Sequence, residues 1–301
     1  MSGTVPILTT ADGTVAQALD AAAARLRDAG VDGARRDALL LLAAALNEEP
    51  AAVRARPERI LDGAARARFD AYVASRAGRE PVSRILGARE FWSLPFAISA
   101  DTLDPRPDSE TLVAAVLTHI GDRTAPLTIL DLGTGSGCLL LALLSELPAA
   151  RGLGIDVSEA AVGVARRNAV DLGLAGRSAF LCAPWGAALA GAWQVIVSNP
   201  PYIVSRDIPH LAPEVRLFDP PLALAGGADG LDAYRDLAPD IARLLAPGGV
   251  AALEIEPAQI ENVEGVLQAA GLRGLGRARD LAGHWRCILA EGSEIPAEWR
   301  K

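Results

Sequence analysis

Two short segments contain the residues whose types and spacing could do chemistry. The first reads Asp131-Leu132-Gly133-Thr134-Gly135-Ser136-Gly137 and lies between an apolar strand-like segment and an apolar helix-like segment. Glycines at alternate positions permit a tight turn and a close approach of the backbone to a ligand. A dinucleotide-binding fingerprint would need another glycine at 138, where Cys138 stands. The turn therefore disfavours NAD and points to another small cofactor.

Two acidic residues accompany this turn. Asp131 ends the strand that enters the turn, where its carboxylate could bind a cationic amino group. Asp156 falls at the end of the next predicted strand, where a carboxylate can accept hydrogen bonds from both hydroxyls of a ribose. An acid for an ammonium, glycines beneath an adenosine and an acid for its ribose predict S-adenosyl-L-methionine, with S-adenosyl-L-homocysteine as the product. A purely structural turn is the alternative.

The second segment is Ser198-Asn199-Pro200-Pro201-Tyr202, which follows another predicted strand. Consecutive prolines remove backbone donors and leave carbonyl groups free to accept hydrogen bonds. A planar NH2 group could donate one hydrogen to the Asn199 side-chain oxygen and the other to the Pro200 carbonyl. Held in this way, the nitrogen could direct its lone pair at a sulfonium methyl, with catalysis by orientation and electrostatic preorganisation. A rigid strand-to-loop turn is the alternative here.

Composition excludes several other classes of protein. The chain has 301 residues, is 50% hydrophobic and carries a formal net charge of −8, which suits two folded domains. No apolar run approaches the roughly 20 residues of a membrane-spanning helix, and the N-terminal segment shows no signal-peptide pattern. Three scattered cysteines and three scattered histidines predict reduced thiols and no metal site. We therefore expect a cytoplasmic protein.

These chemical segments must be positioned by two kinds of domain. Residues 1–80 predict a small helical bundle, with Thr14 capping the first helix and further helices over 33–46, 51–56 and 63–76. An accessory role and a partner-docking role for this bundle are both open at this point. Residues 81–108, rich in proline and aromatic residues, predict a β-hairpin linker, and a helix is expected to begin near Pro107.

Residues 109–301 alternate between strand and helix patterns. This predicts an α/β fold with a doubly wound, seven-stranded, mostly parallel sheet that binds ligands at the carboxyl ends of its strands. The predicted strands cover 127–132, 152–155, 179–182, 193–198, 249–253, 274–278 and 285–289, and the clearest helices cover 138–147, 159–172, 233–245 and 259–270.

The combination of motifs resembles a known family. The segments LDPRPDSE, LDLGTGSGCL, IVSNPPYI and DLAGHWRCIL are together similar to the bacterial protein-glutamine N5-methyltransferases that modify class-1 peptide chain release factors. The Asn-Pro-Pro-Tyr motif alone is shared with enzymes that methylate nucleobase amines or other amides, whereas its combination with PRPDSE is specific. The resemblance extends over nearly the whole chain.

The resemblance implies a Rossmann-like methyltransferase sheet with an antiparallel terminal strand, and it implies roles for individual residues. S-adenosyl-L-methionine would lie against Gly133 to Gly137, including Thr134 and Ser136, with its ribose on Asp156 and its adenine near Trp185. The substrate amide would bind at Asn199-Pro200-Pro201-Tyr202, and Arg106 and Glu110 would line the mouth of the site. The implied partner is a class-1 release factor, methylated on the glutamine of its Gly-Gly-Gln loop, with the helical bundle helping to dock it.

Two departures from the family pattern affect this interpretation. Asp104 stands before PRP where an apolar residue is usual, and His284 and Trp285 stand in the closing segment. Neither touches the glycine turn or the Asn-Pro-Pro-Tyr motif, so they bear on substrate fit rather than on the chemistry. Glu254 and Glu256 end a strand near the predicted site, and ordinary strand-end positions are the alternative for them.

Other functions remain to be compared with this one. A nucleobase-amine methyltransferase would use the same chemistry but should carry a basic groove or an extra domain to flip the base. All of the excess negative charge lies beyond residue 80, because the first 80 residues are balanced. An acidic catalytic half argues against nucleic acid as a direct partner, and no membrane partner is expected. A non-catalytic adaptor would not need an intact Asn-Pro-Pro-Tyr motif.

Overall fold

The computed structural model describes residues 13–292, and the chain divides after Leu86 into a helical unit and an α/β unit. The predicted absence of a signal peptide concerns residues that lie outside this described range. The helical unit contains α1 (Val15–Asp28), α2 (Ala34–Leu46), α3 (Pro50–Arg54), α4 (Gly63–Ala77) and α5 (Val82–Leu86).

Local sequence signals fix the ends of the first helices. The Thr14 hydroxyl accepts a hydrogen bond from the Gln17 backbone N–H (3.3 Å), and the Gln17 side chain accepts one from the Thr14 N–H (3.0 Å). This capping box confirms the predicted start of α1. Asn47, in the left-handed conformation, ends α2 as predicted. A buried ion pair between Arg76 and Asp37 (2.9 Å) joins α4 to α2.

A β-hairpin begins the α/β unit. Strands β1 (Ala88–Phe91) and β2 (Leu94–Ala97) pair antiparallel through a turn in which Trp92 and Ser93 both have positive φ. Phe91 and Phe96 are fully buried and meet edge to face, with ring centroids 6.2 Å apart. Because both rings belong to the hydrophobic core of the sheet, the hairpin is packed into the α/β unit.

The central sheet has the strand order β5-β4-β3-β6-β7-β9-β8. All neighbouring pairs are parallel except those of β9, which runs antiparallel to β7 and β8. The predicted antiparallel terminal strand is thus last in the chain but lies inside the sheet. The strands are β3 (Thr128–Leu132), β4 (Arg151–Asp156), β5 (Ser178–Cys182), β6 (Trp193–Ser198), β7 (Leu245–Glu254), β8 (Leu272–Arg279) and β9 (Trp285–Gly292).

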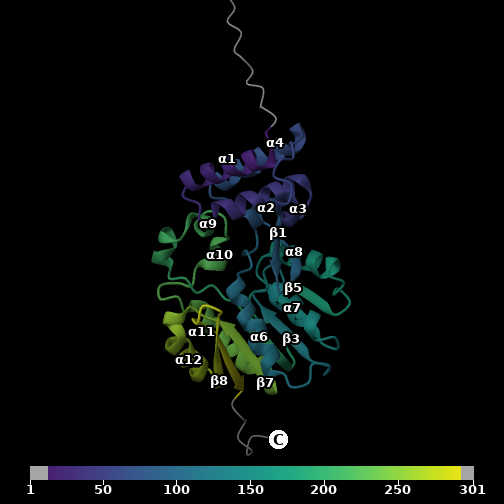
Figure 1. Ribbon diagram of the computed structural model, residues 1–301. Coiled ribbons are helices and arrows are strands. Elements are labelled where there is room, and N and C mark those ends of the chain that lie inside the picture. The colour runs from purple at the N-terminus through teal and green to yellow at the C-terminus, as the bar shows by residue number, and fades with distance from the viewer. Residues whose placement is uncertain (1–12, 293–301) are drawn as a thin grey trace, which may run out of the picture. The chain divides into compact units, whose positions relative to one another are not determined.

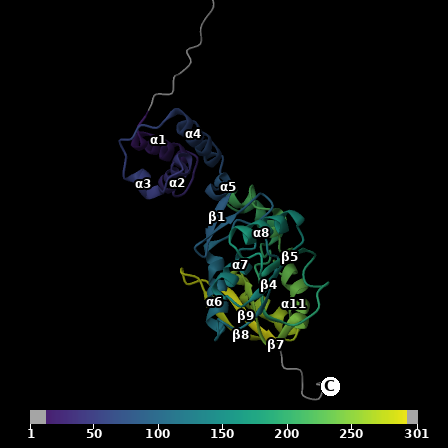
Figure 2. The same cartoon turned by 90° about the vertical axis from the view of Figure 1, so that its right-hand side faces the viewer.

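Helices cover both faces of the sheet, as Figures 1 and 2 show. Alternate strand residues enter two separate cores: Ile129 joins the core on one face and Leu130 the core on the other. This period of two is the pattern of strands that are buried on both sides. One face is covered by α6 (Glu110–His119), α7 (Cys138–Glu146) and α8 (Glu159–Asp171), and the other by α11 (Asp232–Leu244) and α12 (Ile260–Ala269).

The predicted fold class is confirmed, and the long elements begin and end within a few residues of their predicted positions. Several short helices were not predicted, because each has only three to six residues and most begin at proline rather than with a periodic apolar pattern. No helix within residues 13–292 combines the length and apolar character needed to cross a membrane. These unpredicted helices are α5, already given, η2 (Ser205–His210), α9 (Pro213–Arg216), α10 (Pro221–Leu224) and η3 (Pro257–Gln259). The short helix η1 (Pro107–Ser109) leads directly into α6 and begins where a helix was expected.

Candidate active site

The glycine turn leaves β3 at its carboxyl end and leads into α7. Gly133, Gly135 and Gly137 all have positive φ, between 54° and 82°, a region that disfavours other residues. The N–H groups of Gly133 and Thr134 both donate to the Ile155 carbonyl (2.9 and 2.8 Å), which ties the turn to β4. A Cβ atom at Gly135 would meet nothing within 4 Å. The turn therefore presents bare backbone to open space, as a ligand cradle requires.

Asp131 lies beneath this turn and is completely buried. One carboxylate oxygen accepts a hydrogen bond from the Thr134 hydroxyl (2.7 Å), while its Oδ1 has no hydrogen-bond partner among the described residues. Burial raises the pKa of Asp131 to about 7, although the Thr134 hydrogen bond opposes the rise. A buried acceptor without a partner is costly. Its chemistry fits the amino group of S-adenosyl-L-methionine, which would supply both a donor and a positive charge.

Asp131 should make the stability of the protein depend on pH. A carboxyl whose pKa is raised in the folded chain favours folding while it is protonated, and this contribution is lost as pH rises from its unfolded pKa to its folded pKa. For Asp131 that window runs from 3.8 to about 7. In the absence of cofactor, raising the pH from about 5 to about 8 should therefore lower the Tm of the wild type more than the Tm of Asp131→Asn. Equal falls in thermal melts of the two proteins would contradict this assignment.

Asp156 ends β4 beside the turn. Its two carboxylate oxygens accept hydrogen bonds from the N–H groups of Gly135 and Ser158, each at 2.9 Å. Because a carboxylate oxygen has two lone pairs, both oxygens can still accept from a ribose hydroxyl. Asp156 thus holds the glycine turn and the residue that precedes α8, and its oxygens keep further acceptor capacity.

Trp185 follows β5 and reaches back over the turn. A Cβ atom at Gly133 would lie 3.4 Å from the Trp185 ring, so the two are in close contact. The backbone of Trp185 has a positive φ of 45°. Its loop is held by α11: Asp240 accepts from the Gly186 N–H (3.0 Å) and Arg243 donates to the Gly186 carbonyl (2.9 Å). The ring is therefore placed beside the cradle, where an adenine could contact it.

The buried turn residue Ser136 is fixed from behind. Its carbonyl accepts a hydrogen bond from Asn168 Nδ2 (2.8 Å), and the same Asn168 amide pairs with the backbone of Ala97 on β2. Asn168 is only 1% exposed. One buried amide on α8 thus connects the glycine turn to the hairpin, a contact that the sequence gave no reason to expect.

The Asn-Pro-Pro-Tyr segment leaves β6, the strand next to β3. The Ser198 hydroxyl donates to the Leu132 carbonyl (2.6 Å) and so joins the ends of the two strands. Asn199 Nδ2 donates to the Ser109 hydroxyl oxygen (3.2 Å). With its nitrogen engaged, the Asn199 amide keeps its Oδ1 as an acceptor. The two motifs therefore emerge side by side at the same edge of the sheet, as the parallel topology requires.

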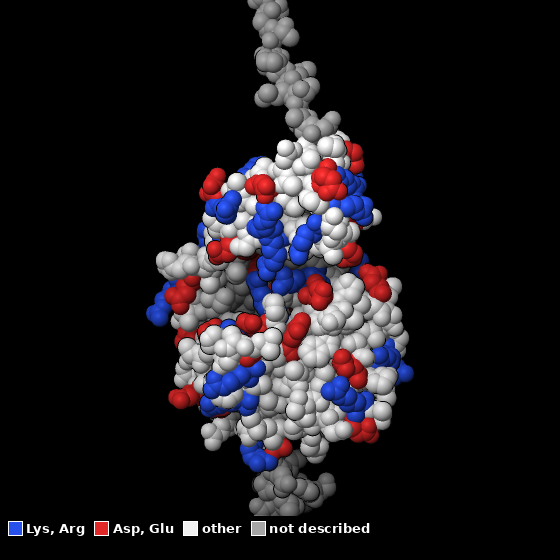
Figure 3. Space-filling model, viewed as in Figure 1, with Lys and Arg blue, Asp and Glu red and all other residues white. Residues whose placement is uncertain are grey.

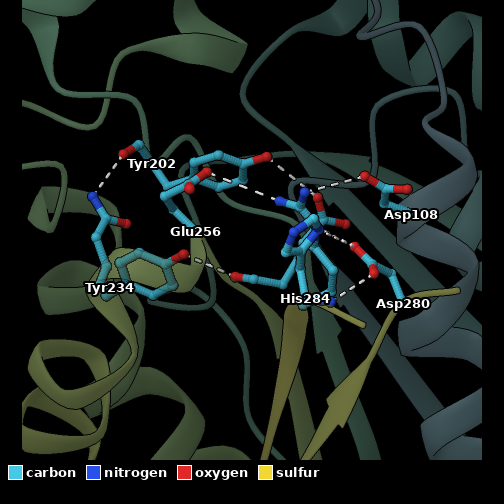
Figure 4. Close-up of polar contacts among 9 residues, drawn as sticks. Asp108, Tyr202, Tyr234, Glu256, Asp280 and His284 are labelled. Carbon is cyan, nitrogen blue, oxygen red and sulfur yellow. Dashed lines mark hydrogen bonds and ion pairs between the residues drawn. The ribbon is translucent and has the colours of Figure 1, made fainter. Parts of the chain in front are cut away.

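Tyr202 is held at both of its ends. Its carbonyl accepts a hydrogen bond from Gln259 Nε2 (3.0 Å), and its hydroxyl lies 3.5 Å from Glu254 Oε1 (Figure 4). Burial raises the pKa of Tyr202 and the negative charge of Glu254 raises it further, so the phenol stays protonated. The protonated Tyr202 side chain can therefore line the cavity and donate a hydrogen bond, but it is not suited to act as a base.

A cavity of about 470 Å³ opens beside the Asn-Pro-Pro-Tyr motif. Arg106 lines it and forms an ion pair with Asp219, which is almost completely buried. Glu110 is placed differently: its Oε1 accepts from the Trp92 N–H (2.8 Å), and it lies outside the set that lines this cavity. Other lining residues include Leu103, Asn199, Tyr202, Ile203, Val215, Leu224, Glu254 and Glu256.

Arg286 on β9 is a central cation of the site that the sequence reasoning did not single out. Its guanidinium contacts Asp280 (3.0 Å), Asp108 (3.3 Å) and Glu256 (3.9 Å) (Figure 4). The three acids come from three separate segments, so one arginine joins the start of α6, the end of β7 and the β8–β9 turn. Its place in the closing segment DLAGHWR was the only available signal.

The residues at the two departures from the family pattern have structural explanations. The Asp104 N–H donates to Asp219 (3.3 Å), and the buried Asp104 carboxylate faces Arg89 at 3.8 Å. In the closing turn, the His284 N–H donates to Asp280 (2.9 Å). The Arg279 guanidinium lies 3.8 Å from the Trp285 ring centroid. Asp104 thus contacts the Asp219 carboxylate that pairs with Arg106, and the His284 backbone contacts the Asp280 carboxylate that pairs with Arg286.

Within residues 13–292 no group of three or more His, Cys, Asp or Glu residues could hold a metal ion. The arrangement instead combines a bare glycine cradle, two acids at strand ends and an amide clamp at the switch point of a doubly wound sheet. This fold and this site define a class I, S-adenosyl-L-methionine-dependent methyltransferase.

Comparisons with known proteins narrow this class. The family model for the PrmC N-terminal domain matches residues 17–87, and that for the Methyltransferase small domain matches residues 88–214. The release factor glutamine methyltransferase of Rhodospirillum rubrum is 52% identical over 90% of this chain and 83% of its own length. That of Caulobacter vibrioides is 44% identical over 95% of this chain and 98% of its own length. The chain belongs to the release factor glutamine methyltransferase family.

A solved structure supports the fold alone. The hMettl16 catalytic domain, in complex with the MAT2A 3'UTR hairpin 6, aligns with a TM-score of 0.54 at 16% identity. The alignment covers 75% of this chain and 83% of that one. Similarity at this level extends to the architecture of the sheet and its helices.

Proposed function

We propose that the protein transfers a methyl group from S-adenosyl-L-methionine to the side-chain N5 of the glutamine in the Gly-Gly-Gln motif of class-1 release factors. The names and high identity of the relatives support this substrate. The cofactor supplies an electrophilic methyl group on its sulfonium and leaves as S-adenosyl-L-homocysteine.

The observation that carries the proposal is the state of the Asn199 amide. Its Nδ2 is engaged by Ser109, so its oxygen is left to accept, and Asn199 lines the cavity of about 470 Å³. Next to it, Pro200 contributes a carbonyl acceptor and, like Pro201, has no N–H to compete for the substrate. Two acceptors on one rigid segment suit the two N–H donors of a primary amide.

The residues of the chain perform complementary tasks in this scheme. Asp131 binds the ammonium of the cofactor, Gly133 to Gly137 with Thr134 and Ser136 form its cradle, and Asp156 binds its ribose. Trp185 borders the adenine, and Asn199 also borders the reacting end of the cofactor. Asn199 and Pro200 hold the glutamine nitrogen so that its lone pair faces the methyl group, and Pro201 and Tyr202 shape the pocket. No strong base is needed before transfer, because the amide nitrogen becomes acidic once it is methylated.

Partner recognition extends beyond the cavity. Arg106, which lines the cavity, and Glu110, whose carboxylate also accepts the hydrogen bond from the Trp92 N–H, would line the mouth of the site and contact the release factor. The helical unit, residues 13–86 of the described chain, contributes a docking surface for the same partner. The enzyme works in the cytoplasm, without a metal ion and without direct contact with nucleic acid or a membrane. On the visible face of the α/β unit, basic side chains occur in separate groups with acidic ones among them (Figure 3).

A substrate comparison tests the proposal against its main alternative. Release factor isolated without the modification, a release factor whose Gly-Gly-Gln glutamine is alanine, and adenine-containing single-stranded DNA would each be incubated with enzyme and labelled S-adenosyl-L-methionine. We expect label transfer to the first substrate alone. Transfer to DNA, or equal transfer to the alanine variant, would overturn the assignment of the glutamine as acceptor.

A further inference from the structure

A groove of about 670 Å³ lies between α6 and β8, the edge strand of the central sheet, on the α/β unit. The two elements are neighbours in both ribbon views (Figures 1 and 2). The α6 wall is a stripe of small residues at helical spacing, so the helix leaves room beside the strand. This stripe consists of Thr111, Ala114, Ala115 and Thr118.

The strand side of the groove presents apolar surface to solvent. Leu275 on β8 is 36% exposed, and Leu281 in the β8–β9 turn is fully exposed. Leu289 and Ala278, which pack into the core on this face of the sheet, also line the groove. A single exposed leucine is ordinary, but exposed leucines on an apolar groove are typical of a binding surface.

The groove begins where the catalytic cavity ends. Asp108 and Asp280 line the groove, and Glu256 lines the cavity. The guanidinium of Arg286 contacts all three carboxylates, at 3.3, 3.0 and 3.9 Å (Figure 4). One side chain therefore separates the two hollows. A polypeptide with one glutamine in the cavity must lead away from it, and the groove offers a continuous path.

The end of the groove next to the cavity carries an excess of negative charge. Two cations there, Arg279 and Arg286, face four carboxylates, those of Asp108, Glu110, Glu256 and Asp280. Farther along, the Arg277 charge is balanced by Glu264 on α12 at 2.7 Å. Complementary potential at this end belongs to a basic side chain.

The length of the groove suits a short extended segment. Helix α6 has 10 residues and rises about 1.5 Å per residue, so its wall is about 15 Å long. An extended chain advances about 3.3 Å per residue, so four or five residues span roughly this length.

We propose that the groove between α6 and β8 holds an extended segment of the release factor that flanks the acceptor glutamine. A basic side chain of this segment lies at the Asp108 end, and apolar side chains lie against Ala114 and Leu275. The proposal rests on the proposed function for the identity of the partner. It adds a recognition surface beyond the cavity, by which the enzyme distinguishes one glutamine by the residues beside it.

Two substitutions of opposite charge test the groove by kinetics. Leu275→Glu and Ala114→Arg both change exposed positions, and each should raise the KM for release factor by about tenfold with little change in kcat. Because the added charges differ in sign, a rise in both variants reports the loss of apolar space. Val170→Glu on α8 and Ala269→Arg on α12 are the exposed matched controls and should keep the wild-type KM. A wild-type KM in both groove variants would overturn the proposal.

Ionic strength tests the basic side chain. The KM for release factor should rise between about 0.05 M and about 0.5 M salt, and it should rise less steeply in Asp108→Asn. Asp171→Asn, an exposed change at the end of α8, should retain the wild-type salt dependence. The same slope in Asp108→Asn as in the wild type would remove the basic side chain from the proposal.

Photo-crosslinking needs no turnover and separates this proposal from the proposed function. Benzoylphenylalanine would replace Leu275 or Thr118, with Val170 as the control position, in a mixture of enzyme, release factor and S-adenosyl-L-homocysteine. We expect both groove positions to crosslink residues within about five of the Gly-Gly-Gln glutamine. Crosslinks elsewhere on the release factor, to a second copy of the enzyme, or no more frequent than at Val170 would overturn the proposal.

The two proposals fail in different ways. Crosslinks at the expected residues, without methylation of release factor by the wild-type enzyme, would refute the proposed function and keep the docking groove. Methylation of the glutamine without these crosslinks would refute the docking groove alone.

Discussion

Replacing Asn199 by alanine is expected to lower kcat by about a hundredfold to a thousandfold, the usual cost of removing one preorganised hydrogen-bonding group from a transition state. The reason is geometric: the side-chain oxygen left free by the bond to Ser109 is one of two acceptors for the substrate amide. The affinity for S-adenosyl-L-methionine should change by only a few-fold, because the glycine cradle and Asp156 are untouched. Single-turnover kinetics and calorimetry would measure the two effects separately.

The chain offers a matched control for this variant. Asn262 is exposed on α12, so Asn262→Ala makes the same chemical change away from the site. It should retain wild-type kcat. Wild-type turnover by Asn199→Ala would show that the amide clamp is not how the substrate nitrogen is held, even if methylation itself were established.

Asp156→Ala should weaken binding of S-adenosyl-L-methionine by about tenfold to a hundredfold, because hydrogen bonds to a charged group are worth about 1.5–3 kcal/mol. The variant removes the ribose acceptors and also releases the N–H groups of Gly135 and Ser158. Asp156→Asn retains one acceptor oxygen and should have an intermediate effect. Titration calorimetry of the unliganded enzyme measures these affinities directly.

A second aspartate provides the comparison. Asp171 lies exposed at the end of α8, the helix that Asp156 precedes, so Asp171→Ala removes the same charge without touching the turn. Its cofactor affinity should match the wild type. Unchanged affinity in Asp156→Ala would instead place the ribose somewhere else in the site.

The two chemical motifs could be predicted because each is continuous in sequence. The glycines from Gly133 to Gly137 adopt the positive φ angles that the turn needs. Pro200 and Pro201 have no N–H, so they leave backbone carbonyls free to accept hydrogen bonds. Apolar strands alternating with helices then specify a parallel sheet, whose carboxyl ends must bring the two motifs together. For these residues, local sequence and global topology specify the same site.

The supporting residues could not be predicted in this way. Ser109, Glu254 and Arg286 come from three distant segments, and each is a common residue at an ordinary position. Only the packing of α6 beside the sheet brings Ser109 to Asn199, and only the order β7-β9 brings Arg286 to Glu256. The hydrogen bond from the Trp92 N–H to Glu110 could not be predicted either, because it depends on how the hairpin packs, while the place of Glu110 at the mouth of the site stays a proposal from the resemblance.

The most direct measurement is the mass of an unmodified class-1 release factor after incubation with this enzyme and S-adenosyl-L-methionine, followed by fragment mapping. The account predicts a mass gain of one methylene unit, located on the glutamine of the Gly-Gly-Gln motif and absent with Asn199→Ala. An unchanged mass, with cofactor binding demonstrated in the same preparation, or a methyl group mapped to another residue, would contradict it.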